Sequence, residues 1–180
     1  MISRFFRGLV AATALVAGVA TVAEAQMSSP SRFGIKAGVA LPMGTFGDAA
    51  GLGIHAGAHL GFPMTDNLGL RFDADYGYYS GEGAVDKVTL LGGVANLMLN
   101  IPTESGFKPY VFGGLGAYSW ESPSGFGVAF DGATELAFNV GAGYDFTMGS
   151  RSWFTELRFL SIQRDGDALN TLPIVIGMRF

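Results

Sequence analysis

The chain has 180 residues, a formal net charge of −4 and no cysteine, and 28 of its residues are glycine. Charged residues make up 14% of the chain, against roughly 25% in ordinary soluble domains. This length suits one domain, and the missing cysteines exclude a disulfide scaffold, thiolate metal sites and thiol catalysis. An acidic chain without basic clusters also argues against nucleic acid as a partner.

The first 25 residues have the composition of a secretory signal peptide. Arg4 and Arg7 supply a basic start, and an apolar run of mostly small residues follows over 8–22. A membrane anchor is the competing interpretation. It is the weaker one, because the run is short for a spanning helix and ends in a cleavage pattern.

The predicted cleavage site lies between Ala25 and Gln26. Ala23-Glu24-Ala25 fits the A-x-A pattern of signal peptidase sites. We therefore expect a signal peptide over 1–25 and a mature domain over 26–180. The mature net charge would be −5, because two arginines and one glutamate are removed.

The mature chain is dominated by a period of two, which is typical of β-strands because successive side chains point to opposite faces. The clearest run is 68–79, where Arg71, Asp73 and Asp75 share one face and the other face is apolar. We predict eight strands, at 31–41, 52–62, 68–79, 88–100, 109–120, 134–146, 153–159 and 172–180. For 88–100 and 109–120 the pattern leaves open which face is which.

The connections between these strands alternate in character. Those at 41–50, 80–86, 121–131 and 163–170 are polar, glycine-rich and mostly longer, and those at 63–67, 102–107 and 147–152 are tighter. Outer-membrane barrels have long outside loops and short periplasmic turns. We therefore expect both termini in the periplasm.

A membrane barrel explains the two faces better than a soluble sandwich does. Glycines gather on the polar face, as at Gly53, Gly57 and Gly61, and small residues suit the crowded inside of a narrow barrel. Aromatic residues gather near the ends of the apolar faces, as an interfacial girdle requires: Phe33, Phe62, Tyr76, Tyr78, Tyr144, Phe146, Trp153 and Phe180. The predicted fold is all-β, an eight-stranded antiparallel up-and-down transmembrane β-barrel.

The polar faces would then enclose a network of charges in the lumen. Its predicted members are Lys36, His55, His59, Arg71, Asp73, Asp75, Glu135, Asn139, Asp145, Glu156, Arg158 and Arg179. Buried charges must pair, and about eight strands leave room only for side chains. We therefore favour a plugged lumen; the alternative is a narrow channel for water or small solutes.

No catalytic or metal constellation stands out. His55 and His59 lie about 13 Å apart along a strand, too far to share one ion easily. Asp73 and Asp75 are better explained as ion-paired with Arg71 than as an acid–base pair. We expect no cofactor and no enzymatic activity; a lipid A-modifying barrel enzyme with a His–Ser pair is the alternative.

The chain resembles the outer membrane protein β-barrel domain family of small OmpA-, OmpX- and NspA-like barrels. The resemblance rests on GIKAG at 34–38, KPYVFGGLG at 108–116, NVGAG at 139–143 and IGMRF at 176–180. Ile174, Ile176, Met178 and Phe180 also resemble the terminal-strand signal read by the outer-membrane assembly machinery. The resemblance implies an outer-membrane location in a Gram-negative-type envelope, contact with lipids, and periplasmic chaperones during biogenesis. We expect no peptidoglycan-binding module of the longer OmpA type.

Function would then lie in the scaffold or in its exposed loops, because loops on a rigid frame carry recognition. The segments 81–83 and 122–127 are glycine-rich and flexible in composition. We therefore expect an integral outer-membrane protein with a structural or surface-interaction role and a surface ligand, if any, held by loops.

Overall fold

The computed structural model describes residues 32–81, 87–104, 107–121, 134–164 and 168–180. Three predictions concern residues outside these ranges: the signal peptide over 1–25, its cleavage site at Ala25 and Gln26, and the loop segments 81–83 and 122–127 apart from residue 81.

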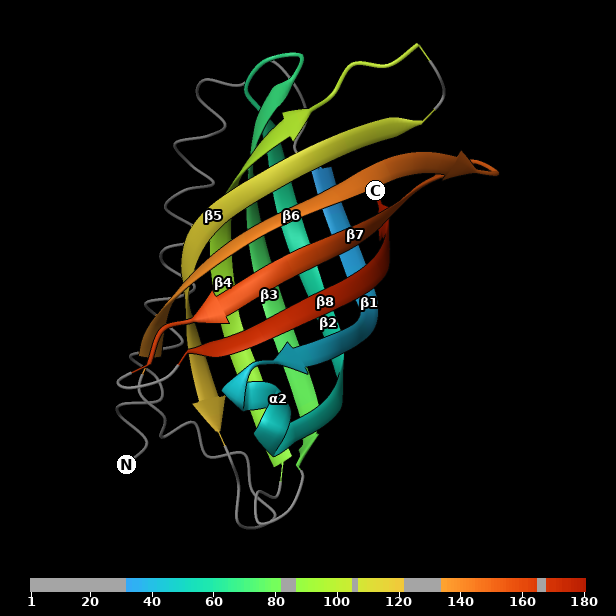
Figure 1. Ribbon diagram of the computed structural model, residues 1–180. Helices are drawn as coiled ribbons and strands as arrows, with labels where there is room; N and C mark the ends of the chain where they lie inside the picture. Colours follow the sequence, from blue (N-terminus) through green and yellow to red (C-terminus); the bar gives the residue numbers. More distant parts are fainter. Residues whose placement is uncertain (1–31, 82–86, 105–106, 122–133, 165–167) are drawn as a thin grey trace, which may run out of the picture. The chain divides into compact units, whose positions relative to one another are not determined.

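Eight antiparallel strands form a closed barrel in which each strand pairs with its neighbours in the sequence and β8 pairs with β1 (Figure 1). The elements are β1 (Arg32–Met43), α2 (Thr45–Ala49), β2 (Ala50–Pro63), β3 (Leu68–Gly81), β4 (Lys87–Asn100), β5 (Lys108–Glu121), β6 (Thr134–Met148), β7 (Arg151–Ile162) and β8 (Leu169–Arg179). The predicted fold class is confirmed. No helix among the described residues is both long and apolar enough to cross a membrane.

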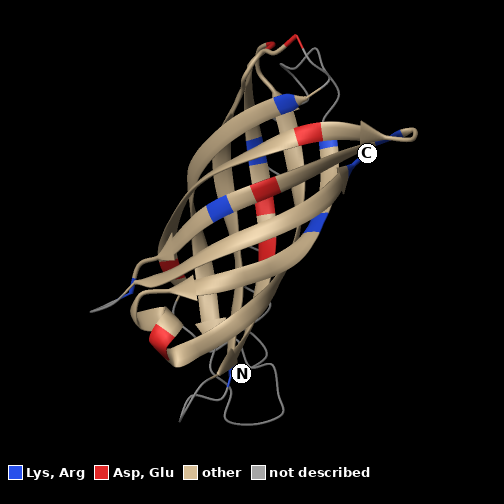
Figure 2. Ribbon diagram, turned by 45° about the vertical axis from the view of Figure 1, so that its right-hand side comes forward, with Lys and Arg blue, Asp and Glu red and all other residues tan. Residues whose placement is uncertain are grey.

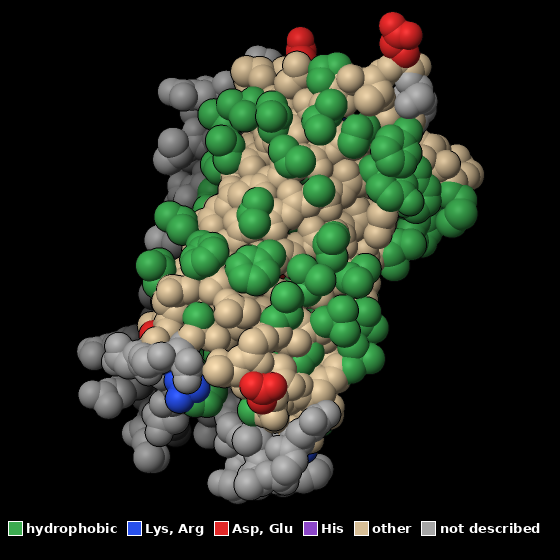
Figure 3. Space-filling view, viewed as in Figure 1, with side chains coloured by type: hydrophobic (Ala, Val, Ile, Leu, Met, Phe, Trp, Pro, Cys, Tyr) green, Lys and Arg blue, Asp and Glu red, His purple; other side chains and the backbone are tan. Residues whose placement is uncertain are grey.

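Alternation along each strand sorts the side chains into an outer apolar face and an inner face. Outward side chains such as Ile54, Leu115 and Val140 are 59%, 64% and 56% exposed. The face seen in Figure 3 is accordingly covered with hydrophobic side chains, and the acidic and basic ones visible there lie near the two ends. A closed sheet also leaves no unpaired backbone edge, as an apolar surrounding requires.

The barrel has two different rims. The C-terminal rim is where β1 begins and β8 ends, and its connections are 64–67, 101–107 and 149–150. At the other end, the α2 rim, the connections are 44–49, 82–86, 122–133 and 163–168. The predicted alternation of tight and longer connections holds in part: 64–67 and 149–150 are shorter than any connection at the α2 rim, whereas 101–107 is longer than three of those four.

The short helix α2 is a feature that the sequence pattern did not indicate, since 41–50 reads only as a polar loop. Gly44 precedes it with a φ of 61°, a conformation that glycine adopts readily. Phe46 turns inward and is buried, with its ring 5.0 Å from that of Tyr79 in an edge-on contact. The helix therefore fastens the first loop onto the end of the barrel.

The structure shows which faces of β4 and β5 point inward, a question that the sequence pattern left open. Asn96 on β4 and Tyr110 on β5 are buried in the interior, while Leu97 and Val111 point outward. In β4 the face that carries Asn96 is thus the inner one. In β5 the inner face carries aromatic side chains, so both faces are apolar and the sequence shows no contrast.

Aromatic rings gather in pairs at the C-terminal rim. They are Phe33–Phe180, Phe62–Phe72, Phe107–Tyr144 and Tyr144–Phe146, with centroids 4.4–6.0 Å apart. These rings form the kind of belt that membrane barrels place at the lipid–water interface.

Candidate functional site: the enclosed interior of the barrel

The interior is organised around Asp75, whose side chain is fully buried. Lys36 Nζ lies 2.9 Å from one carboxylate oxygen and His55 Nε2 lies 3.2 Å from the same atom. Arg158 Nη1 at 2.7 Å and the Tyr118 hydroxyl at 2.9 Å both donate to the other oxygen. Asp75 thus collects four partners from four other strands, which is how a buried carboxylate is stabilised.

Asp73, two residues earlier on the same inner face of β3, is equally enclosed. Lys36 Nζ donates to Oδ1 at 2.5 Å, and Arg158 Nη2 donates to the same oxygen at 3.1 Å. Arg71 Nε at 2.8 Å and Asn96 Nδ2 at 2.7 Å donate to Oδ2. Lys36 and Arg158 therefore bridge both carboxylates of β3.

Glu156 on β7 completes the ionic layer. Arg71 donates to it through both terminal nitrogens, and the Nη2 bond measures 3.3 Å. The Tyr110 hydroxyl donates to Oε1 at 2.8 Å, and Arg158 Nη2 lies 3.7 Å from Oε2. This forked pairing is the geometry in which arginine binds carboxylate most strongly.

The layer is balanced in charge. Three cations face three carboxylates, all of them buried: Lys36, Arg71 and Arg158 against Asp73, Asp75 and Glu156. We call these six residues the ionic layer; Figure 2 marks the charged positions along the strands. Balance is required in a closed lumen, because an uncompensated buried charge is far more costly than a paired one.

Neutral side chains complete the pairing. Asn139 Nδ2 donates to Asn96 Oδ1 at 2.9 Å, which extends the polar contacts from β4 to β6. The ring of Phe112 lies under two guanidinium groups, 4.5 Å from Arg71 and 5.4 Å from Arg158. An aromatic face stabilises a cation that has left water.

Toward the C-terminal rim lies a second, smaller pair. Arg179 on β8 donates to Asp145 on β6, and both side chains are largely buried. The guanidinium of Arg179 also lies 5.2 Å from the Tyr110 ring and 4.8 Å from the Phe154 ring. This pair is separate from the ionic layer, because no ion pair joins the two groups among the described residues.

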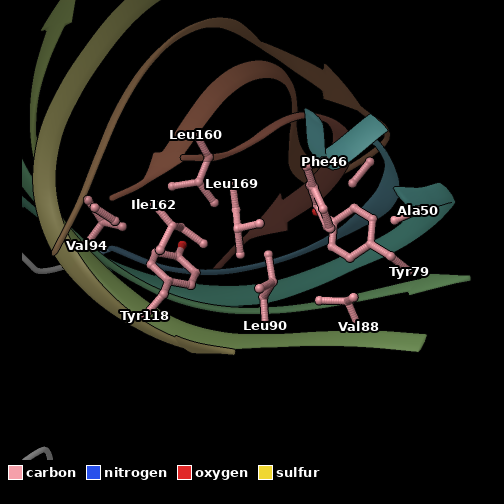
Figure 4. Close-up of a cluster of buried hydrophobic side chains, with 12 residues drawn as sticks. Phe46, Ala50, Tyr79, Val88, Leu90, Val94, Tyr118, Leu160, Ile162 and Leu169 are labelled. Atoms are coloured by element: carbon pink, nitrogen blue, oxygen red, sulfur yellow. The ribbon is translucent and has the colours of Figure 1, made fainter. Parts of the chain in front are cut away.

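Toward the α2 rim the interior becomes apolar. A cluster of buried side chains fills it: Ala40, Phe46, Ala50, Tyr79, Val88, Leu90, Val94, Tyr118, Ala137, Leu160, Ile162 and Leu169. We call this the apolar layer; Figure 4 shows its side chains meeting inside the strands. The Tyr79 hydroxyl is satisfied by Thr171 at 2.8 Å. The inside is therefore polar over only part of its length, and the sequence analysis did not predict the apolar layer.

The predicted lumen residues fall into three groups. Eight take part in the ionic layer or are linked to it, His55 by a direct bond and Asn139 through Asn96: Lys36, His55, Arg71, Asp73, Asp75, Asn139, Glu156 and Arg158. Asp145 and Arg179 pair with each other. His59 and Glu135 lie on inner faces, but neither forms an ion pair with a described residue.

His59 is placed differently from His55, although both lie on one face of β2. Its ring packs edge-on against Phe154 at 5.2 Å, and a β-carbon at Gly34 would collide with it. Its Nδ1 atom is buried and has no hydrogen-bond partner in the described part of the barrel. Glu135, opposite Tyr118 near the α2 rim, is half-buried.

Sequence reasoning missed the four residues that bond to or pack on the ionic layer, Asn96, Tyr110, Phe112 and Tyr118. All four lie on the strands whose phase was open. The sequence did contain a signal for the orientation of β5. Tyr110, Phe112, Tyr118 and Trp120 are separated by even numbers of residues and therefore share one face of the strand. Tyrosine can line a lumen because its ring fills space and its hydroxyl reaches a carboxylate.

The chemistry that this interior supports is charge pairing. His55 is engaged by Asp75, and neither histidine hydrogen-bonds a serine hydroxyl among the described residues. Within the same residues no group of three or more His, Asp or Glu side chains is arranged to hold a metal ion.

Comparisons with known structures point to small outer-membrane barrels. Neisserial surface protein A (NspA) matches with a TM-score of 0.65 and 19% identity, covering 84% of this chain and 96% of that one. The N-terminal β-barrel domain of Pseudomonas aeruginosa OprF matches with a TM-score of 0.50 and 17% identity, covering 83% and 97%. The outer membrane enzyme PagL matches with a TM-score of 0.53 and 15% identity, covering 84% and 99%. At these identities the likeness concerns the fold.

A search of curated proteins finds no match to this chain. A family model, in contrast, matches residues 12–180, which include every strand of the barrel. Together with the closed eight-stranded sheet and its apolar exterior, this match makes the chain a member of the outer membrane protein beta-barrel domain family, located in the outer membrane.

Proposed function

We propose that the mature chain, 26–180, is a non-conducting outer-membrane scaffold that presents the loops of its α2 rim at the cell surface. The observation that carries this proposal is the filling of the lumen by two successive layers. The ionic layer occupies the middle of the barrel, and the apolar layer lies between it and the α2 rim. A solute entering from either end would have to displace paired charges or packed hydrophobic side chains.

The charge pairs themselves argue against a water-filled path. Arg71, Arg158 and Glu156 are each no more than 2% exposed, and each is bonded to groups on other strands. Ions in a wet channel exchange partners with water, whereas these are held by several partners at once. The alternative of a narrow channel would require this layer to open.

Conductance in planar bilayers tests this proposal. Purified mature protein should give no steady current, and a stable current in the porin range would contradict a filled lumen. Folding is verified on the same sample by gel mobility, since a folded barrel migrates faster when it has not been boiled. This check separates a closed barrel from a misfolded one.

The proposed sidedness follows from connection length. The two shortest connections, 64–67 and 149–150, lie at the C-terminal rim and the longest, 122–133, belongs to the α2 rim, which supports periplasmic termini and exposed loops at the α2 rim. The chain has no cysteine, so single cysteines can be placed cleanly. In intact cells a membrane-impermeant maleimide should label Asp48→Cys on α2 and should spare Ser150→Cys in the turn at the C-terminal rim. The reverse labelling would contradict the proposed orientation.

We also propose that the barrel is not an enzyme. His55 is bonded to Asp75 and contacts the ionic layer, which leaves it poorly placed to activate a hydroxyl nucleophile. The fold likeness to PagL does not extend to a His–Ser pair among the described residues. An assay for lipid A hydrolysis should show no activity above that of a His55→Ala, His59→Ala double variant. Activity that the double variant lacks would overturn this proposal.

For biogenesis we propose that the last strand carries the signal read by the assembly machinery, after export with periplasmic chaperones. Ile174, Ile176 and Phe180 point outward and are 41%, 52% and 58% exposed, as an apolar recognition edge requires. Replacing Phe180 with serine should lower the outer-membrane level of the protein in cells without preventing refolding of the purified chain into detergent.

A further inference from the structure

A small pocket opens inside the C-terminal rim, between β1, β2, β3, β4 and β8. Its volume is about 60 Å³, several times the ~10–15 Å³ that one water molecule needs. The polar side chains that line it are Arg32, His59, Arg71, Asn100 and Arg179. The proposed function leaves this pocket without a role, because it touches the ionic layer only at Arg71 and lies apart from the apolar layer.

The charge around this pocket is one-sided. Three arginines line it, and none of the described residues that line it carries a carboxylate. Arg71 is already balanced within the ionic layer, and Arg179 is balanced by Asp145. Arg32 is exposed and makes no ion pair with any described residue, although it lies near enough to Asp145 for their charges to interact. Arg32 and Arg179 therefore face one carboxylate, which leaves one positive charge in surplus at the mouth.

His59 gives a second and independent indication. Its side chain is 3% exposed and lines the pocket, yet its Nδ1 atom has no hydrogen-bond partner in the part of the chain that the structure describes. Leaving a buried polar atom unpaired is costly, and in native proteins such an atom is usually paired with a protein group, a water or a ligand. In the tautomer that carries the proton on Nδ1, this atom is a donor. A donor beside surplus positive charge favours an anion.

The position of the pocket, at the rim that meets the lipid headgroups, indicates which anion it would bind. Phe62 lines the pocket and pairs with Phe72 in the aromatic belt of the same rim, where membrane barrels meet the lipid headgroups. Phosphate is the abundant oxyanion at that depth, and guanidinium groups match its geometry. Arg32 lies at the mouth of the pocket, where its guanidinium group can pair with the phosphate of a headgroup or with a free ion.

We infer that this pocket binds a phosphate group, held by Arg32 and Arg179 and hydrogen-bonded by His59. The inference does not depend on the proposed orientation of the barrel or on its lack of conductance. The phosphate could belong to free phosphate or to an anionic phospholipid headgroup, and the experiment distinguishes these two sources.

The chain contains two histidines, which makes their imidazole ¹⁵N signals a direct readout. Mature protein, folded in a phosphate-free maltoside detergent, is titrated with inorganic phosphate in one arm and with short-chain phosphatidylglycerol in the other. Either probe should shift the His59 signals saturably, while His55, bonded to Asp75, should stay nearly unchanged. A response to phosphate indicates the free ion, and a response confined to phosphatidylglycerol indicates the headgroup.

Two arginine variants test the specificity of the site. Arg32→Gln should weaken the apparent affinity about tenfold, as the loss of a charged hydrogen bond does. Arg151→Gln removes an exposed arginine of the same rim that does not line the pocket, and should leave the affinity unchanged. The inference is overturned if neither probe shifts His59, if both variants weaken binding equally, or if chloride at equal ionic strength produces the same shift.

Discussion

Removing one charge from the ionic layer should destabilise the barrel strongly. Asp75→Asn keeps the size of the side chain but leaves three buried cations facing two carboxylates. Lys36 and Arg158 each lose a charged contact, at 2.9 and 2.7 Å, and the Tyr118 hydroxyl loses a charged acceptor. Breaking a buried pair in this way costs about 3–5 kcal/mol of unfolding free energy.

Charge balance can be restored by a second substitution. In the double variant, which combines Asp75→Asn with Lys36→Met, two arginines face two carboxylates. Arg71 keeps its bond to Asp73 at 2.8 Å and its pair with Glu156, and Arg158 keeps its contact with Asp73 at 3.1 Å. We expect the double variant to lose only about 1–3 kcal/mol, less than either single variant. The two effects would then be coupled by at least about 3 kcal/mol, which is the upper end of the range usual for residues in contact.

The assay is urea unfolding of mature protein in lipid vesicles, followed by tryptophan fluorescence and by the mobility of unheated samples on gels. Asp48→Asn, exposed on α2, is the matched control and should change stability by less than about 0.5 kcal/mol. A loss below about 1 kcal/mol for Asp75→Asn would refute the reasoning. Additive losses in the double variant would show that charge balance does not govern this layer.

Three further changes probe other parts of the barrel. Leu115→Arg, on the lipid-facing side in the middle of β5, should cost about 2–4 kcal/mol in the same unfolding assay. Gly114→Ala should prevent folding, because its β-carbon would collide with the backbone oxygen of Ala95, whereas Gly113→Ala faces outward and should yield the fast-migrating folded band. Phe46→Ala should cost about 3 kcal/mol and still give no steady current in bilayers, because the rest of the apolar layer stays in place.

The strands and the closed sheet could be predicted because lipid and lumen impose opposite demands on alternate residues. In β3 the contrast is complete, with Arg71, Asp73 and Asp75 inside and apolar residues outside, so its phase was clear. In β5 the contrast disappears, because Tyr110 and Phe112 fill the lumen while Val111 faces outward. A pattern of hydrophobicity cannot orient a strand that is apolar on both sides.

Other features depend on contacts that no local pattern contains. The helix α2 forms where the ring of Phe46 packs against that of Tyr79, a residue 33 positions away in the chain. Likewise, nothing in the sequence distinguished His55 from His59. In the structure His55 is bonded to Asp75, whereas His59 packs against Phe154 and its Nδ1 atom has no partner among the described residues. The alternation along each strand predicted that both histidines lie inside the barrel, but the partners of each histidine are set by the register between distant strands.

The ionic layer is better understood as a device that specifies this register than as a source of net stability. Buried ion pairs often contribute little compared with a packed apolar core. A slip of β3 by one residue, however, would turn Arg71, Asp73 and Asp75 toward lipid, since each residue of slip exchanges the two faces. A cation at the bilayer midplane costs about 2–4 kcal/mol, and the cations left inside would lose their carboxylates as well. Correct pairing is therefore favoured from both sides of the barrel wall, and this explains why charges lie in a lumen that aliphatic side chains could have filled.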